Sequence, residues 1–368
     1  MMLRLRLDGV LQDVVAFEIK DFWKYLQKLK FISGVKMNVS ALPQDGRFGF
    51  EASNPQGEKK KVDARVNFMP GLETESTVIR FLDSTRGVST FKDIGFSDRE
   101  YEILKKYLTK TTGFIIVSGP TGSGKTTTLY SILHTLNTGQ NKIITLEDPI
   151  EYEMSGVFQS QIDYTKHYDY ETGLKAILRH DPDIILVGET RSQESAEIAV
   201  NASLTGHLVF TTLHTNSAIS SIGRLVSMDV RPYLLAPALQ LVIGQRLVRK
   251  VCPHCTTQRK ASYAEESEIK KTLENLQRLG NTVLPVYDGQ VAQANGCERC
   301  NHTGYLGRIA ILELLEVTEE IRKLIVDQGT DFDIFASARA NGFITLQEDG
   351  ILKVLDGVTT VEEVHRVG

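Results

Sequence analysis

The sequence predicts an α/β fold in which a doubly wound parallel sheet is covered by crossover helices. From residue 96 onward, short apolar runs alternate with helical stretches, and each of four central runs ends in polar residues. These runs are Phe114 to Val117, Ile143 to Leu146, Ile184 to Val187 and Leu208 to Leu213. In such a sheet ligands bind beyond the carboxyl ends of the strands, so we expect the polar residues to converge on one crevice.

Residues 1–95 predict a separate α+β domain. Strand alternation covers Leu3 to Leu11, a helix is expected from Asp21 to Leu29, and turns are expected at Gln44-Asp45-Gly46 and Asn54-Pro55-Gln56-Gly57. The chain opens directly in a strand pattern. We therefore expect that an upstream region is lacking, either because this sequence is a fragment or because the protein does not have it.

The rest of the chain is predicted to form a catalytic domain over 96–248, a cysteine-containing subdomain over 249–310 and a helical subdomain over 311–368. A polar helix from Asp98 to Leu108 opens the catalytic domain. From Thr318 onward the pattern predicts amphipathic helices that stop at Gly342, Gly350 and Gly357.

Composition indicates a soluble globular chain. Its 368 residues are 41% apolar, which is enough for a sizeable core, and its net charge of −4 argues weakly against nucleic acid as the main partner. No apolar run reaches the length of about 18 residues needed to span a bilayer, since the most apolar stretch, Leu234 to Ile243, contains Pro237 and Gln240. The N-terminal alternation does not read as a signal peptide. We therefore expect a cytoplasmic protein with peripheral membrane contact at most.

A glycine-rich loop follows the first apolar run and precedes a helix expected from Thr126 to Leu136. Its sequence, Gly119-Pro120-Thr121-Gly122-Ser123-Gly124-Lys125-Thr126, followed by Thr127, matches a nucleoside triphosphate-binding P-loop. The glycines let backbone N–H groups turn inward around phosphate oxygens, Lys125 neutralises the β- and γ-phosphates, and Thr126 ligates Mg²⁺. A helix N-terminus adds to the attraction for phosphate. The loop predicts ATP and magnesium binding.

Glu189 follows the run Ile184 to Val187, with Gly188 where many P-loop enzymes have an aspartate. Glu189 is therefore the predicted catalytic carboxylate, which would orient the attacking water in line with the γ-phosphate. A solvated glutamate at the end of a strand is the alternative.

Three acidic residues, Glu147, Asp148 and Glu151, follow the second run. They are positioned to hold the water shell of a magnesium ion or the attacking water. For Asp148, capping of a helix that begins at Pro149 is an equally good explanation.

Two histidines, His207 and His214, flank the fourth run. His214, at the carboxyl end, could reach the γ-phosphate and respond to its loss. The alternative is that both histidines are structural.

The four cysteines form two pairs, Cys252/Cys255 and Cys297/Cys300, in a chain without an export signal, where thiols stay reduced. Two CxxC pairs suit a tetrahedral Zn²⁺ with four thiolate ligands. Because four thiolates leave no open coordination position, the predicted zinc ion is structural. The polar stretch Thr256 to Asn295 is expected to be a helical excursion from this site.

Together these motifs resemble those of the type II secretion and type IV pilus assembly ATPases, over about Leu3 to Gly368. Gly119 to Thr126 matches the family's Walker A motif, Ile144 to Tyr152 its aspartate box, Asp181 to Glu189 its Walker B motif and Leu204 to Asn216 its histidine box. Gly188 is therefore a family trait. The cysteine pairs match the tetracysteine motif of the assembly and secretion branches, which the related retraction ATPases lack.

The resemblance implies a RecA-like P-loop NTPase core, a PAS-like N-terminal domain and a homo-hexamer, with nucleotide held between the two domains. It also implies arginines that reach the phosphates: Arg65 and Arg80 in the N-terminal domain, and Arg179 and Arg191 in the core. A surface ion pair is the alternative for each arginine.

Three departures from the family pattern stand out. Lys175 replaces an arginine, which weakens a bidentate contact, and Ser192 replaces the aspartate that usually follows Arg191. The upstream domain, through which the family docks on the secretion apparatus and some members sense cyclic di-GMP, is not in this sequence.

We therefore predict an ATP-hydrolysing hexameric motor that acts through an inner-membrane platform protein and moves pilin or pseudopilin subunits. One alternative is a nucleic-acid translocase or DNA-uptake motor, although no basic and aromatic interleaving surrounds the cysteines. A second alternative is a non-catalytic scaffold switched by nucleotide, against which Lys125, Thr126 and Glu189 argue. No direct nucleic-acid contact is expected.

Overall fold

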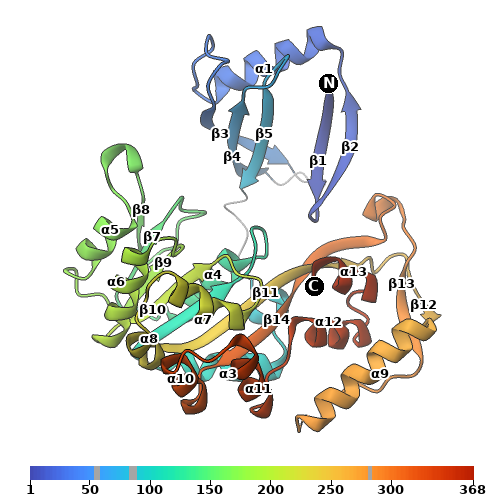
Figure 1. The fold of residues 1–368 in the computed structure, drawn as a ribbon. Helices are drawn as coiled ribbons and strands as arrows, with labels where there is room; N and C mark the ends of the chain where they lie inside the picture. The colour runs from blue at the N-terminus through green and yellow to red at the C-terminus, as the bar shows by residue number, and fades with distance from the viewer. Residues whose placement is uncertain (54–58, 83–88, 281–283) are drawn as a thin grey trace. The chain divides into compact units, whose positions relative to one another are not determined.

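The computed structural model describes residues 1–53, 59–82, 89–280 and 284–368 (Figure 1). The chain divides into two compact units. The first contains Met1–Gly87 and Glu151–Glu153, and the second contains Val88–Ile150 and Met154–Gly368.

The first unit is an α+β domain built on a three-stranded antiparallel sheet of order β3-β4-β5. Its core is formed by Leu26, Val66 and Phe68, because one face of β4 and one face of α1 are apolar. Its elements are β1 (Met2–Leu7), β2 (Val10–Ala16), α1 (Ile19–Ile32), β3 (Gln44–Ser53), β4 (Lys59–Met69) and β5 (Ser76–Leu82).

The first unit corrects two of the expected elements. The strand pattern from Leu3 to Leu11 is a β1–β2 hairpin, because Asp8 and Gly9 both have positive φ (46° and 87°) and reverse the chain. The expected turn at Gln44-Asp45-Gly46 is instead the start of β3. A Cβ atom on Gly46 would lie 2.6 Å from Ser33, so this glycine serves a close approach of two segments. The turn expected at 54–57 lies outside the described residues.

The second unit is centred on a seven-stranded sheet of order β14-β11-β6-β10-β9-β7-β8. Its neighbouring strands pair in parallel except β14, which pairs antiparallel to β11. The strands of this unit are β6 (Gly113–Ser118), β7 (Ile143–Glu147), β8 (Phe158–Gln161), β9 (Ile184–Val187), β10 (Leu208–Leu213), β11 (Leu239–Val251), β12 (Thr256–Lys260), β13 (Gln290–Ala294) and β14 (Tyr305–Glu316). The four apolar runs of the sequence are thus β6, β7, β9 and β10, and the predicted α/β core is confirmed.

Helices of the second unit pack against this sheet and against one another. Phe114 and Ile116 of β6 share one large core with residues of α5, α6, α7 and α8, whereas α4 contacts β6 and begins at Lys125, within the P-loop motif. The helices are α2 (Phe91–Ile94), α3 (Asp98–Leu108), α4 (Lys125–Leu136), α5 (Tyr170–Ile177), α6 (Gln193–Leu204), α7 (Ala218–Ser227), α8 (Pro232–Ala238), α9 (Tyr263–Arg278), α10 (Glu319–Val326), α11 (Asp331–Ala340), α12 (Leu346–Leu355) and α13 (Val361–Val367).

The segment between the cysteine pairs contains more than the expected helix. The antiparallel strands β12 and β13 frame α9, and Figure 1 shows this group beside α12 and α13. Strand β11 crosses the predicted boundary at 248/249, and β14 crosses the one at 310/311. Gly350 does not stop a helix but lies inside α12, where a Cβ atom would come within 2.7 Å of Val364 on α13.

Candidate active site and metal centre

The P-loop connects β6 to α4, as predicted. Gly119, Gly122 and Gly124 have φ values of 151°, 81° and 89°, which side-chain-bearing residues rarely adopt. Lys125 is 8% exposed, and its Nζ donates to the carbonyl oxygens of Gly119 (2.7 Å) and Pro120 (3.0 Å). Pro120, Thr121, Thr126 and Thr127 are exposed, whereas Ser123 is buried. The loop therefore folds its backbone around the buried ammonium group of Lys125.

The electrostatic surroundings of Lys125 weaken its hold on a proton. Burial lowers the pKa of Lys125 to about 8; Glu189 opposes this shift and Arg246 adds to it. A phosphate brought to the loop would supply the negative charge that restores the ammonium form.

Glu189 lies at the carboxyl end of β9 and is held there by its neighbours. The backbone N–H of Gly188 donates to the Leu146 carbonyl (2.7 Å), and the Thr212 hydroxyl donates to the Gly188 carbonyl (2.7 Å). The residue is only 9% exposed. The backbone that carries Glu189 is thus fixed by the two strands on either side of β9.

Arg191 and His214 face the Glu189 carboxylate. The Arg191 Nε lies 2.5 Å from Glu189 Oε1, and the His214 Nε2 lies 3.6 Å from Glu189 Oε2. Burial lowers the pKa of His214, with help from Lys125 and Arg191 and against the pull of Glu189. The lowered pKa favours the neutral imidazole form of His214. Lys125, Glu189, Arg191 and His214 form one cluster, which we call the strand-end cluster.

Glu147 at the end of β7 is buried, and both of its carboxylate oxygens accept hydrogen bonds. Tyr130 donates to one oxygen, and Thr145 (2.6 Å) and Gln159 (3.2 Å) donate to the other. Glu147 thus joins β7, β8 and α4. Asp148 is exposed and Glu151 is half-buried. No helix begins at Pro149, which follows Asp148 in a bend, so the capping alternative for Asp148 is wrong.

His207 and Arg179 lie at the amino ends of the strands, opposite to the end where the P-loop lies. His207 precedes β10, and its Nδ1 lies 2.9 Å from the Ala202 carbonyl, which is the structural role considered for it. Arg179 is exposed and precedes β9. The carbonyl of the next residue, His180, accepts a hydrogen bond from Lys142, which directly precedes β7, so Arg179 lies near the amino ends of both strands. Neither side chain can reach the P-loop of its own chain across the length of a strand.

In the first unit, Arg65 of β4 lies directly opposite Arg80 of β5 in the antiparallel ladder. Arg47 of β3 lies opposite Arg65 on its other side. Residues directly opposite each other project from the same face, so three guanidinium groups form a row there. The sequence analysis had selected Arg65 and Arg80 but not Arg47.

Two of the three departures from the family pattern, Ser192 and Lys175, have local explanations. The Ser192 hydroxyl accepts from the Ser195 N–H (3.2 Å) and caps α6, a role that serine fills as well as aspartate. Arg191 has Glu189 as its partner instead. Lys175 forms an ion pair with Glu171 one helical turn away.

Sequence reasoning missed two residues of this region. Tyr170 at the start of α5 is 8% exposed, and its hydroxyl lies 3.1 Å from where a Cβ atom on Gly188 would be. Burial and the nearby carboxylates of Glu189 and Asp148 raise the pKa of Tyr170, so it stays a neutral phenol. Gln245 of β11 contacts the P-loop itself. No motif marks either residue, and Gln245 is also distant in sequence from the P-loop.

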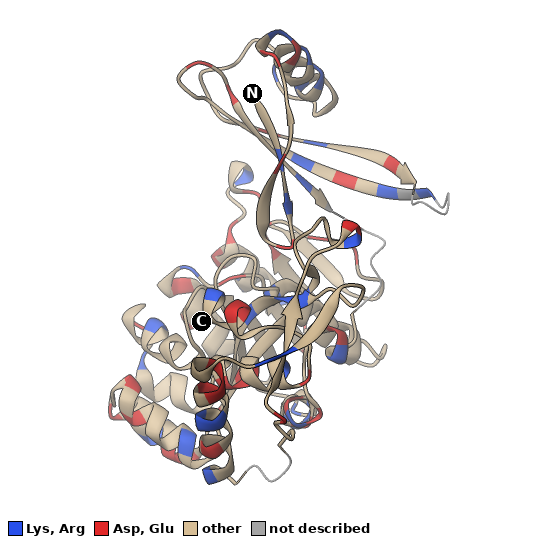
Figure 2. Ribbon diagram, turned by 90° about the vertical axis from the view of Figure 1, so that its right-hand side faces the viewer, with Lys and Arg blue, Asp and Glu red and all other residues tan. Residues whose placement is uncertain are grey.

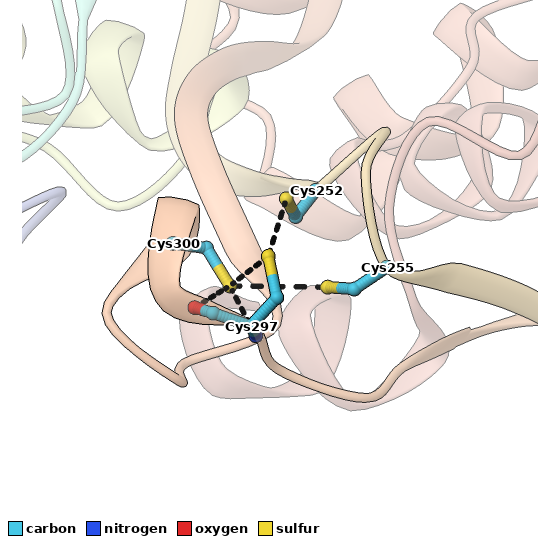
Figure 3. A group of neighbouring side chains, drawn as sticks. All are labelled: Cys252, Cys255, Cys297 and Cys300. Atoms are coloured by element: carbon cyan, nitrogen blue, oxygen red, sulfur yellow. Dashed lines mark hydrogen bonds between the residues drawn. The ribbon is translucent and has the colours of Figure 1, made fainter.

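The four cysteines form a compact cluster in which the sulfur atoms lie within 4.8 Å of one another (Figure 3). The Sγ–Sγ distances are 3.9 Å for Cys252–Cys297, 3.8 Å for Cys255–Cys300 and 3.7 Å for Cys297–Cys300. A tetrahedral ion with bonds of about 2.3 Å to sulfur requires edges of about 3.8 Å. The four donors therefore fit a metal ion.

The backbone around Cys300 favours the thiolate form of this cysteine, whereas burial raises the pKa of Cys255 to about 12. Burial raises the pKa of the Cys300 thiol, but N–H groups of Cys297 and Gly304 donate to its sulfur (3.1 and 3.3 Å) and bring the pKa down to about 6. His254, inside the first pair, faces Arg299 with nitrogen distances of 3.0 and 3.2 Å.

Basic and acidic residues are mixed along the part of the ribbon that the structure describes. Figure 2 shows basic and acidic residues interspersed along the ribbon in that view, in agreement with the net charge of −4. Within the described ranges, no helix combines the length and apolar character that crossing a bilayer requires.

Comparison with known proteins assigns the family. The model of the type II/IV secretion system protein family matches residues 1–366. The chain belongs to this family.

Relatives within this family match the chain along its whole length. The type II secretion system protein E of Pseudomonas aeruginosa is 40% identical over 367 residues, which cover 100% of this chain and 70% of that protein. The type IV pilus assembly ATPase PilB of Thermus thermophilus is 40% identical over 361 residues, which cover 98% of this chain and 39% of that protein.

A solved structure supports the fold. The pilus retraction motor PilT with bound ADP is similar with a TM-score of 0.60 at 25% identity, over 99% of this chain and 90% of that chain. The fold predicted from the sequence, a P-loop core with an N-terminal α+β domain, is thus confirmed.

Proposed function

We propose that this protein is an ATP-hydrolysing motor that works as a homo-hexamer and powers protein secretion or the assembly of pilin or pseudopilin subunits. It would act on the cytoplasmic face of the inner membrane through a platform protein of the secretion or pilus machinery. The support is twofold: membership of the type II/IV secretion family, with relatives named as a type II secretion system protein and a type IV pilus assembly ATPase, and the chemistry of the strand-end cluster.

The observation that carries the proposal is the meeting of Glu189, His214 and Lys125 at the carboxyl edge of one sheet. Lys125 places a cation at the base of a phosphate-binding loop, and a buried carboxylate lies close enough to interact with it. A carboxylate held there can accept a hydrogen bond from water and orient it toward a γ-phosphate. His214 Nε2 lies 3.6 Å from the other carboxylate oxygen, and a neutral imidazole has a single N–H. That N–H would donate to Glu189 or, once nucleotide is bound, turn to a phosphate oxygen.

Magnesium fits the same edge. The Thr126 hydroxyl is exposed in the first turn of α4, where P-loop proteins provide a ligand for the ion, and Asp148 is exposed at the end of the neighbouring β7. When bound with nucleotide, Mg²⁺ would neutralise charge between the β- and γ-phosphates. Glu147 would serve by holding β7 and α4 together rather than by touching the ion.

Arginines would complete the phosphate site. Arg191 already faces the cluster, and Arg65 and Arg80 would act from the first unit. Arg179 lies at the amino ends of the strands in its own sheet, away from the P-loop. Its contact with phosphate would therefore require the P-loop of a neighbouring subunit. We further propose zinc as the metal of the four cysteines, because its preference for closed thiolate tetrahedra matches the Sγ–Sγ distances.

The test is steady-state ATP hydrolysis by a hexameric preparation of Glu189→Gln. This substitution keeps the size of the side chain and removes its charge, so turnover should fall about 100-fold or more while nucleotide affinity is retained. Glu274→Gln, at an exposed glutamate of α9, should leave turnover unchanged.

Full turnover by the Glu189→Gln hexamer would refute the catalytic role of this glutamate. Strong stimulation of the wild type by single-stranded DNA, with steep salt dependence, would instead favour a nucleic-acid translocase.

A further inference from the structure

The P-loop is supported from the side by β11, a strand to which the sequence motifs assign no role. Strand β11 runs parallel to β6, and Gly244 pairs with Ser118 at the point where β6 gives way to the loop. The next residue, Gln245, is 1% exposed. Its side chain therefore lies beneath the P-loop and out of reach of solvent.

The Gln245 amide joins the loop to the helix that follows it. Its Nε2 donates to the Ser123 carbonyl (2.8 Å), and its Oε1 accepts from the Thr128 hydroxyl (2.8 Å). Ser123 is 3% exposed and Thr128 is fully buried, so water cannot replace either bond. One side chain thus fixes the distance between the tip of the loop and the first turn of α4.

Two of the P-loop glycines meet this same residue. A Cβ atom on Gly119 would lie 2.4 Å from the Gln245 carbonyl, and one on Gly124 would lie 2.8 Å from its Nε2. These glycines let the loop lie directly on β11, in addition to providing positive φ. The path of the loop is consequently set by contact with Gln245 as well as by its own backbone.

We propose that Gln245 is a positioning residue that holds the P-loop in its phosphate-receiving conformation. This inference rests on the proposed nucleotide binding. The primary amide suits the role because it offers a donor and an acceptor at the same end of one side chain. Without it, the Ser123 carbonyl and the Thr128 hydroxyl would be buried and unpaired, and the loop would shift to relieve them, so that its N–H groups would no longer converge.

The experiment is titration of the full chain with a fluorescent ADP analogue in the presence of Mg²⁺. Gln245→Leu keeps the bulk of the side chain but loses both bonds, so the dissociation constant should rise about tenfold or more. Gln240→Leu is the matched control, since Gln240 is also a buried glutamine of β11 but contacts Lys110 and the Pro237 carbonyl rather than the P-loop. Its affinity should equal that of the wild type.

A second variant separates positioning from general destabilisation. In Gln245→Glu the ionised carboxylate still accepts from Thr128 but cannot donate to Ser123, whereas the protonated acid can do both. Burial raises the pKa of such a carboxyl, so its affinity relative to wild type should recover as the pH falls from about 8 to about 6. Gln245→Leu should show no such recovery, because it has no group that can titrate.

The outcomes are distinct. Wild-type affinity in folded Gln245→Leu, or a Gln245→Glu variant whose relative affinity does not change with pH, would overturn the positioning role. Absence of ADP binding by the wild type itself would instead contradict the proposed function.

Discussion

At the scale of single residues, Lys125 combines two properties that oppose each other. It must be charged to attract phosphate, yet burial brings its pKa to about 8. The carbonyls of Gly119 and Pro120 hold the ammonium group in place, and Glu189 supplies partial compensation. Lys125 therefore loses the positive charge that attracts phosphate at a pH only slightly above neutral.

We predict that nucleotide affinity falls with rising pH. Since the free protein loses the Lys125 proton above about pH 8 and the bound state needs it, affinity should drop about tenfold between about pH 7 and pH 9. The measurement is ADP titration across this range. Lys125→Arg should bind more weakly but with a flatter profile, because a guanidinium group stays charged. A wild-type profile as flat as that of Lys125→Arg would show that Lys125 does not titrate here.

The predicted site residues that the structure brings together are those that directly follow a strand. Glu189 and His214 could be expected to meet because the ends of neighbouring parallel strands meet. His207 and Arg179 precede strands, so they lie at the amino ends of the same strands, away from that group. Gln245 could not be found, because it lies within the long strand β11 and its partners are distant in sequence.

At the scale of elements, glycines mark close contacts as well as helix ends. Gly350 was expected to stop a helix, but α12 continues through it. The glycine leaves room for α13, which lies against that position. Sequence alone does not separate these two uses, since both place a glycine in a helical pattern. Gly223 lies inside α7 at an exposed position, where a Cβ atom would make only an ordinary van der Waals contact, at 3.5 Å, with Asp331.

Alanine substitutions at these two glycines should therefore have opposite effects. Gly350→Ala adds a methyl group 2.7 Å from Val364 and should destabilise the protein by about 1–3 kcal/mol, despite the better helix propensity of alanine. Gly223→Ala meets no such obstacle and should stabilise by up to about 1 kcal/mol. Thermal unfolding of both variants against wild type is the measurement. Equal shifts in the same direction would mean that contact with α13 does not determine the choice of glycine.

At the scale of the whole molecule, one strand serves both functional regions of the second unit. Strand β11 passes the P-loop at Gly244 and Gln245 and then continues to the first cysteine pair. Its partner β14 returns from the second pair into the same sheet. The sequence predicted both regions but not that they share strands, because pairing of β11 with β14 depends on closing the long excursion between the cysteine pairs.

The closed thiolate cluster predicts a structural rather than catalytic metal. Wild-type protein should contain about one zinc ion per chain, and Cys297→Ser should lose it, because removing one of four donors opens the coordination shell. The consequence should be local: limited proteolysis should cut within 253–304, while ADP affinity changes less than about twofold, since the P-loop is held by β6, α4 and Gln245.

His254→Ala is the matched control for this prediction. His254 lies between Cys252 and Cys255 and contacts Arg299, so it is the nearest competing ligand in the motif, yet the four sulfurs already satisfy a tetrahedral ion. This variant should keep the metal. Loss of zinc from His254→Ala with retention in Cys297→Ser would place histidine in the coordination shell. A large loss of ADP affinity in Cys297→Ser would show instead that the metal centre acts on the P-loop through β11.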